Sequence, residues 1–166
     1  MDEARNIRQV SVYVSYARAD TVRLERFVPV LRSVGCRVWM DEGKVHTNYQ
    51  ELARQLQDDI RVCDVMVVAL SPAAVDSRWV QRETKLAQRL GKPIIPVMVR
   101  AIQPPNTQGM LETIDLYDIE RLEEGTTKLI AALNQVARQG GSTGKNDGAD
   151  ARPKHPSAPP LILIPG

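Results

Sequence analysis

The segment Asp64-Val-Met-Val-Val-Ala-Leu70 sets narrow limits on the fold of this chain. Its apolar residues are consecutive, so both faces of a strand formed here would be apolar. Such strands are typical of parallel sheets covered by helices on both sides, whereas a strand with one solvent-facing side alternates apolar and polar residues. The run ends at Ser71 and Pro72, which interrupts the sheet. We therefore expect a central parallel strand in an α/β domain.

Strand and helix patterns alternate along the rest of the chain. The expected strands are Val10–Tyr16, Cys36–Met40, Asp64–Leu70, Pro93–Val99 and a short strand near Ile114–Tyr117. Segments with helical periodicity follow the first three strands, and a last helix is expected roughly from Glu123 to Ala137. This order predicts a doubly wound sheet whose ligands bind at the carboxyl ends of the strands. The loops expected at that edge are Tyr16–Asp20, Asp41–Tyr49, Ser71–Glu83 and Arg100–Thr107.

Local signals refine these elements. Asp20 is expected to cap the first helix and Gly35 to end it. Pro29 predicts a kink or an early break in that helix. Pro93 and Pro96 predict a strand start and an edge or bulge, because proline cannot donate to a sheet ladder.

Length and charge exclude several classes of protein. A chain of 166 residues with 43% hydrophobic residues is expected to form one globular domain. Its formal charge of +2 gives no basis for binding nucleic acid or an anionic membrane. Cys36 and Cys63 adjoin expected strands, which favours buried reduced thiols. The N-terminus lacks the apolar core of a signal peptide and no segment is long enough to span a membrane, so we expect a soluble cytoplasmic protein.

The composition changes from about Gln139 onward. Residues 139–166 are rich in Gly, Ser and Pro and lack periodicity, which predicts a flexible tail or linker. The apolar L-I-L-I of Leu161–Ile164 is either a linker end or a peptide that docks in a partner's groove.

Glu83 interrupts the apolar stripe of the helix that begins near Ser77. Trp79, Leu86, Ala87 and Leu90 share its helical face. With Ser77 or Asp76 as the N-cap, the capping-box position falls on Val80 or Trp79, and Glu83 has no cation three or four residues away. Local structure does not explain this acid, which is either solvated or functional.

Several chemistries are disfavoured at the strand ends. The first turn, S-Y-A-R-A-D, has no glycine for a phosphate-cradling loop. The third strand ends in Ser71, where a phospho-accepting receiver domain would have an aspartate. The only histidines, His46 and His155, are too few and too isolated for a metal cluster or a Ser-His-Asp triad.

Four blocks of sequence, taken in order, resemble the TIR (Toll/interleukin-1 receptor) domain family of the bacterial type. They are V-Y-V-S-Y-A-R-A-D, R-V-W-M-D, V-V-A-L-S-P-A-A-V-D-S-R-W-V-Q-R-E and K-P-I-I-P-V. The resemblance covers roughly Arg8 to Ala137 and implies a flavodoxin-like five-stranded parallel sheet with helices on both faces. It implies an N-terminal extension over 1–7, a TIR domain over 8–138 and the tail over 139–166.

TIR domains divide into scaffolds that self-associate and enzymes that cleave NAD at the nicotinamide–ribose bond. In the enzymes the catalytic glutamate stands in a W-x-x-x-E arrangement after the third strand, and Trp79 to Glu83 match it. The resemblance thus implies that Glu83 is catalytic, that NAD is a substrate with no further cofactor, and that the product is linear or cyclic ADP-ribose. It also implies a role in bacterial immune defence or signalling.

Other positions are expected to contact substrate through the same resemblance. They are Tyr16, Arg18, Asp41, Lys44, Tyr49, Ser71 and Trp79. The alternatives remain a core phenol for Tyr16, a surface cation for Arg18, a helix cap for Ser71 and a core ring for Trp79.

Asp41 and Lys44 open the segment called the BB loop in this family, which closes over nucleotide and mediates assembly with other TIR protomers. Bacterial members often have G-x-x-W there, whereas this chain has H-T-N-Y over His46 to Tyr49. Two alternatives to NAD cleavage stay open: a TIR scaffold without turnover, and a nucleoside-transferring enzyme of similar fold.

Overall fold

The computed structural model describes residues 10–40, 48–103 and 106–140. Its centre is β3 (Val65–Leu70), the apolar run with which the sequence analysis began. The remaining strands are β1 (Ser11–Ser15), β2 (Arg37–Met40), β4 (Ile94–Met98) and β5 (Ile114–Asp115). All pair in parallel in the order β2-β1-β3-β4-β5. The expected flavodoxin-like sheet is confirmed.

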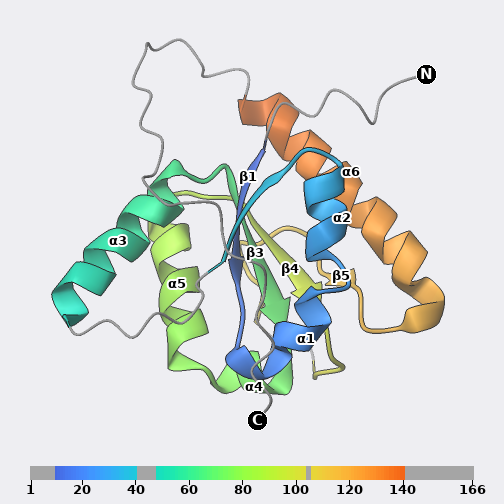
Figure 1. The fold of residues 1–166 in the computed structure, drawn as a ribbon, viewed down its shortest axis with the longest axis horizontal. Helices are drawn as coiled ribbons and strands as arrows, with labels where there is room; N and C mark the ends of the chain where they lie inside the picture. Colours follow the sequence, from blue (N-terminus) through green and yellow to red (C-terminus); the bar gives the residue numbers. More distant parts are fainter. Residues whose placement is uncertain (1–9, 41–47, 104–105, 141–166) are drawn as a thin grey trace.

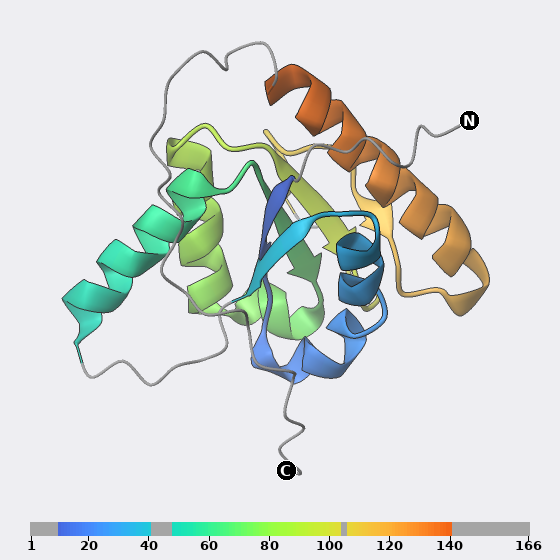
Figure 2. The ribbon, with the colours of Figure 1, turned by 45° about the horizontal axis from the view of Figure 1, so that its top comes forward.

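Helices cover both faces of this sheet (Figure 1). One face carries α3 (Tyr49–Val62) and α5 (Arg78–Arg89), with the short α4 (Pro72–Asp76) at the strand ends. The other carries α1 (Thr21–Leu24), α2 (Val28–Ser33) and α6 (Leu122–Gly140), as Figure 2 also shows. Two short 3₁₀ helices, η2 (Arg18–Asp20) and η3 (Ile119–Arg121), precede α1 and α6.

The two layers explain why β3 is apolar at every position. Val65, Val67 and Ala69 belong to the core cluster under α1, α2 and α6. Met66, Val68 and Leu70 belong to the cluster under α3 and α5. Successive side chains of a strand point to opposite faces, so a strand covered on both sides needs apolar residues at consecutive positions.

The helix boundaries follow local chemistry. The expected first helix is broken into α1 and α2, and Pro29 lies in the first turn of α2, where its missing N–H leaves no bond unmade. Gly35 adopts a φ of 96° and ends α2 as expected. The Asn48 side chain caps α3 by accepting hydrogen bonds from the N–H groups of Gln50 and Glu51. The last helix is longer than expected, because α6 extends to Gly140.

The prolines of β4 occupy the two kinds of position that the sequence predicted. Pro93 directly precedes the strand. Pro96 lies in its interior opposite Val68, but β5 pairs only with Val97 and Met98. The carbonyl of Pro93 accepts a hydrogen bond from the N–H of Met66 in β3. The carbonyl of Ile94 accepts one from the N–H of Leu111, on the other side of β4. By this alternation the nitrogen of Pro96 points away from β3, toward the side on which β5 has not yet begun to pair. Pro96 thus lies at a local edge of the sheet, and the pairing of β4 with β3 contains no bulge.

Both thiols are buried and free, as expected. Cys63 lies at the end of α3 and donates to the carbonyl of Ile60 at 3.0 Å. Burial raises the pKa of Cys63 to about 11 and also raises that of Cys36. Both are therefore protonated at neutral pH.

Several predictions concern residues outside the described part of the chain. These are residues 1–7, Asp41, Lys44, His46 and the tail beyond Gly140. None of the described helices is both long and apolar enough to cross a membrane.

Candidate functional site

The order of the strands reverses between β1 and β3, and this point lies where the sequence predicts ligands to bind. β1 and β3 are neighbours, but the chain continues outward from them in opposite directions, to β2 and to β4. In sheets of this kind the crevice at the carboxyl ends of such strands holds the ligand. Figure 1 shows α1 and α4 together at this edge, each following one of the two strands.

A buried carboxylate and a buried hydroxyl join the two strand ends. The Ser71 hydroxyl donates a hydrogen bond to Oδ2 of Asp20, and both residues are 0% exposed. Ser71 Oγ also accepts from the N–H of Ala74 at 3.0 Å and so caps α4. Oδ1 of Asp20 accepts no hydrogen bond from the described residues.

The prediction that Asp20 caps the first helix is therefore wrong as to its side chain. Asp20 occupies the position before α1, but its carboxylate makes no capping bond and turns inward to Ser71. The turn is held instead by the Thr21 hydroxyl, which donates to the carbonyl of Arg18 at 2.7 Å. Capping serves exposed N–H groups, whereas a buried hydroxyl must find an acceptor inside the fold.

The start of α5 is fixed by two further bonds. Ser77 Oγ accepts from the N–H of Val80 at 3.2 Å, which confirms Ser77 as the N-cap. Gln81 Nε2 donates to the carbonyl of Val75 at 2.8 Å and ties the first turn of α5 to α4. Trp79 and Glu83 then lie one turn apart on a helix whose first turn is joined to α4 by these bonds.

Glu83 is buried at 1% exposure and shares the sheet-facing side of α5 with Val80 and Ala87. The alternative of a solvated acid is excluded in this structure. An ionised carboxylate taken out of water is costly unless polar groups or a ligand compensate it. A buried glutamate on the helix after the central strand is therefore the strongest functional candidate among the described residues.

Trp79 lies half-buried between this face and a groove that separates α3 from α5. The groove has a volume of about 210 Å³. Its lining residues are Leu52, Ala53, Leu56 and Gln57 from α3, and Trp79, Arg82, Leu86 and Arg89 from α5. The indole N–H of Trp79 is buried and donates to no described residue. Glu83 does not line the groove and lies on the neighbouring side of the helix.

The remaining predicted contacts are distributed over the strand-end edge. Tyr16 is half-buried and packs against the cluster of α1, α2 and α6, so it lies on the other layer from α5. Arg18 is exposed in η2. Tyr49 is the first residue of α3, and Asp41 and Lys44 lie outside the described residues.

Asp20 is the residue whose role the sequence did not reveal. An aspartate after a strand and before a helix has the same pattern whether it caps the helix or turns inward. The partner that decides between these, Ser71, lies 51 residues further along the chain. No signal local to Asp20 separates the two cases.

The described residues contain no group of three or more His, Cys, Asp or Glu side chains placed to hold a metal ion. The polar groups that the described residues bring to this region include the buried Glu83 on α5, the Asp20–Ser71 pair and the exposed Arg18.

Comparison with known proteins places this geometry in a family. Residues 12–130 match the family model of the TIR domain. The TIR domain of the Toll-related receptor TRR-2 from Hydra magnipapillata is similar in structure, with a TM-score of 0.61 and 18% identity over 74% of this chain and 96% of that one. The CMP N-glycosidase BcmB from Clostridium botulinum has a TM-score of 0.51 and 19% identity over 72% of this chain and 97% of that one. Among curated proteins, no sequence matches this chain.

Proposed function

We propose that this chain, which belongs to the TIR domain family, is an enzyme that cleaves the bond between nicotinamide and ribose in NAD. The observation that carries the proposal is Glu83, a glutamate 1% exposed in the W-x-x-x-E segment of α5. A carboxylate buried on a helix that follows the central strand of a doubly wound sheet is a candidate functional group.

The reaction needs only one acid. The glycosidic C–N bond breaks and its electron pair passes to the ring nitrogen, so the nicotinamide leaves neutral and requires no protonation. Positive charge then develops on the ribose, as in the oxocarbenium-like transition states of glycosidases. Glu83 stabilises this charge, and water adds to the anomeric carbon and releases a proton to give ADP-ribose. Attack by a nitrogen of the adenine ring would give the cyclic product.

The preorganised carboxylate supplies electrostatic stabilisation of the transition state. Removing a single group of this kind typically costs about 100- to 1000-fold in rate. The effect is large because a site closed to water screens charge weakly. The burial of Glu83 is the structural condition for such an effect.

The other predicted positions are assigned to binding. Arg18 would contact phosphate, for which the guanidinium fork is suited. Tyr16 and Trp79 would border the rings of the substrate. Ser71 would face the ligand at the end of β3, oriented by its bond to Asp20. Asp41, Lys44 and Tyr49 would close the loop before α3 over the nucleotide, and we place the reaction in bacterial immune signalling in the cytoplasm.

The test is incubation of concentrated protein with NAD, followed by chromatography that resolves nicotinamide, ADP-ribose and cyclic products. A parallel incubation with CMP is included because BcmB, which shares the fold, is a CMP N-glycosidase. Release of nicotinamide supports the proposal. Release of cytosine alone would indicate that the substrate is an N-glycoside other than NAD. Release of neither base would favour a scaffold without turnover, such as a receptor TIR domain.

A further inference from the structure

Arg18 and Glu83 lie on two different elements, although the proposed reaction uses both. Arg18 is exposed in η2, which follows β1, whereas Glu83 is buried in α5, which follows β3 and α4. A substrate held by its phosphates at one element and cleaved at the other requires a set distance between them, because a misplacement of about 1 Å can lower the rate about 100-fold. The structure contains a chain of hydrogen bonds that links the two elements.

Asp20 closes η2 and joins it to the end of β3. Its N–H donates to the carbonyl of Ala17 at 2.9 Å, and the Thr21 hydroxyl donates to the carbonyl of Arg18 at 2.7 Å, so hydrogen bonds close this turn on both sides of Arg18. The Asp20 carboxylate accepts a hydrogen bond from the Ser71 hydroxyl, and both residues are fully buried. Arg18 therefore lies on a short turn that is anchored to the central strand.

The path continues from the end of β3 to the catalytic helix. Ser71 Oγ accepts from the N–H of Ala74 at 3.0 Å, and the Ser71 carbonyl accepts from the N–H of Val75 at 3.0 Å, so α4 begins on this residue. The Val75 carbonyl, near the other end of α4, accepts from Gln81 Nε2 at 2.8 Å. Gln81 belongs to the W-x-x-x-E segment and precedes Glu83 by two residues on α5.

We propose that Asp20 and Gln81 are positioning residues of the reaction. The Asp20–Ser71 and Gln81–Val75 hydrogen bonds form a brace that holds η2 at a set distance from Glu83. The proposal rests on the cleavage of NAD proposed above. Binding energy from the phosphates, which are remote from the scissile bond, then serves to orient the ribose against the carboxylate.

The surroundings of Asp20 suit positioning better than stabilisation. Its Oδ2 accepts from Ser71, but its Oδ1 has no donor within the described part of the chain. Taking a carboxylate out of water costs free energy unless hydrogen bonds compensate, and here one oxygen is left uncompensated. What the pair provides is direction, because a serine hydroxyl has a single proton and donates it to one acceptor.

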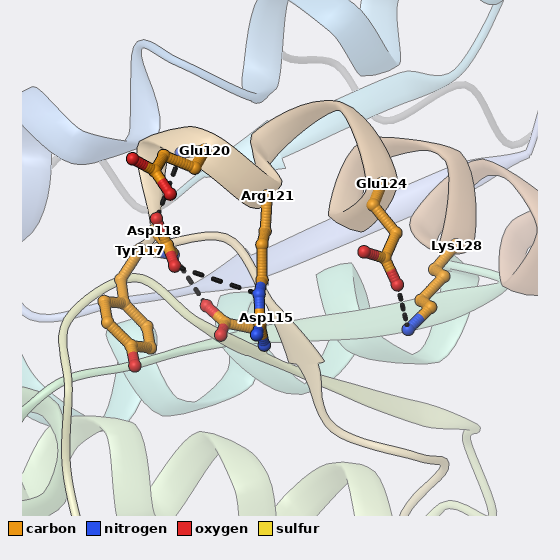
Figure 3. A network of polar contacts seen from close by, with 7 residues as sticks. All are labelled: Asp115, Tyr117, Asp118, Glu120, Arg121, Glu124 and Lys128. Atoms are coloured by element: carbon orange, nitrogen blue, oxygen red, sulfur yellow. Dashed lines mark hydrogen bonds and ion pairs between the residues drawn. The ribbon is translucent and has the colours of Figure 1, made fainter.

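The turn before α6 offers a matched aspartate outside the brace (Figure 3). Asp118 also lies between a strand and a helix, and its Oδ1 accepts from the N–H of Glu120 at 3.0 Å. Its Oδ2 lies 3.9 Å from Arg121, and these two side chains are 37% and 69% exposed. Exposed pairs contribute little to stability, and both bonds stay within residues 118–121. Asp118→Ala is therefore the control for Asp20→Ala.

Two substrates separate positioning from general damage to the fold. NAD carries phosphates, whereas nicotinamide riboside has the same scissile bond and no phosphate for Arg18 to contact. Asp20→Ala should lower kcat for NAD by about tenfold or more and leave kcat for the riboside within about twofold of wild type, because only NAD gains from the brace. A protein that is merely less stable would lose both activities in the same proportion.

The ratio of the two kcat values is then compared across variants. Asp20→Asn keeps an acceptor oxygen for Ser71 and should recover most of the lost ratio. Gln81→Met keeps the length of the side chain but removes the donor, so it should lower the ratio as Asp20→Ala does. Asp118→Ala, and Gln88→Met at an exposed position of the same helix, should leave it unchanged. Equal losses for both substrates in Asp20→Ala, or equal effects in the controls, would overturn the proposal.

Hydrogen exchange, followed by NMR without substrate, tests the brace independently of turnover. Coupling along such a path is established by a response at its far end. Asp20→Ala should speed exchange of the N–H groups of Ala74, Val75 and Gln81 by at least about threefold, and Asp118→Ala should not. Unchanged exchange at Gln81 would overturn the proposal.

The two readouts distinguish failure of the brace from failure of the proposed function. Wild type that cleaves neither substrate would contradict the proposed function alone, and the exchange at Gln81 would then decide whether the brace exists. The same exchange result decides if wild type cleaves NAD but not the riboside.

Discussion

At the scale of single residues, two acids are buried among the described residues, and the sequence revealed only one of them. Glu83 stood out because it interrupts an apolar stripe with no cation three or four residues away in the sequence, and the structure buries it. Asp20 had an ordinary local explanation as a helix cap. The structure contradicts this explanation, because the Asp20 carboxylate accepts a hydrogen bond from the Ser71 hydroxyl instead. Helical periodicity reports which face a residue occupies, but it carries no information on partners that are distant in sequence.

The Asp20–Ser71 hydrogen bond predicts that two substitutions of Asp20 destabilise the domain to different degrees. Asp20→Ala leaves the Ser71 hydroxyl buried without its acceptor, which typically costs about 1–3 kcal/mol. Asp20→Asn keeps an acceptor oxygen and should cost less. Urea denaturation of both variants checks this order. Equal losses of unfolding free energy in the two variants would show that the hydrogen bond does not account for the effect of Asp20→Ala.

The Cys63 thiol predicts a decline of stability at alkaline pH. Its pKa rises from 9.0 to about 11 on folding, so between these values the unfolded chain loses the proton while the folded chain keeps it. Stability is then fully present below pH 9 and falls as the pH rises, by at most about 1.4 kcal/mol per unit of pKa shift. The pH dependence of unfolding free energy for wild type and Cys63→Ala isolates this contribution. Identical slopes for the two proteins would refute it.

At the scale of elements, propensity and packing disagree in α6. Gly125 is an interior helix residue, and alanine there would be favoured by about 1 kcal/mol on propensity alone. A Cβ at this position, however, would lie 2.2 Å from the backbone carbonyl oxygen of Asp115 and 2.6 Å from Leu116. The glycine therefore allows α6 to approach β5 closely.

Gly125→Ala is accordingly expected to destabilise the domain, because the clashing atom belongs to the backbone and cannot rotate away. Overpacking of this kind typically costs about 1–3 kcal/mol. Thermal unfolding measures the effect, and Gln135→Ala on the exposed side of the same helix serves as the control with little or no change. A Gly125→Ala protein as stable as wild type would mean that α6 shifts freely on β5.

At the scale of the whole molecule, the sequence predicted the sheet well because its signals are periodic and repeated. The continuous apolar run of β3 indicated two covered faces, and the alternation of elements indicated a parallel doubly wound sheet. The structure confirms both. Periodicity could not show which side chains meet at the strand ends or how Tyr16 and Glu83 divide between the two helical layers. Those depend on tertiary contacts.

Both core clusters are formed by residues between Val10 and Ala137. Truncation after Gly140 should therefore leave the melting temperature unchanged within error, because the Gly-, Ser- and Pro-rich tail offers little apolar area to offset its chain entropy. Thermal unfolding of the full and shortened chains compares them directly. A clear drop would show that Leu161 to Ile164 dock on the domain.

The central claim is that Glu83 makes this TIR domain a catalyst, and nicotinamide release from NAD by wild type and Glu83→Gln tests it most directly. The substitution keeps the shape of the side chain and removes its charge, and Glu25→Gln at an exposed position is the matched control. We predict that wild type and Glu25→Gln release nicotinamide at similar rates, and that a folded Glu83→Gln is slower by about 100-fold or more. A Glu83→Gln protein that turns over NAD at the wild-type rate would contradict the account.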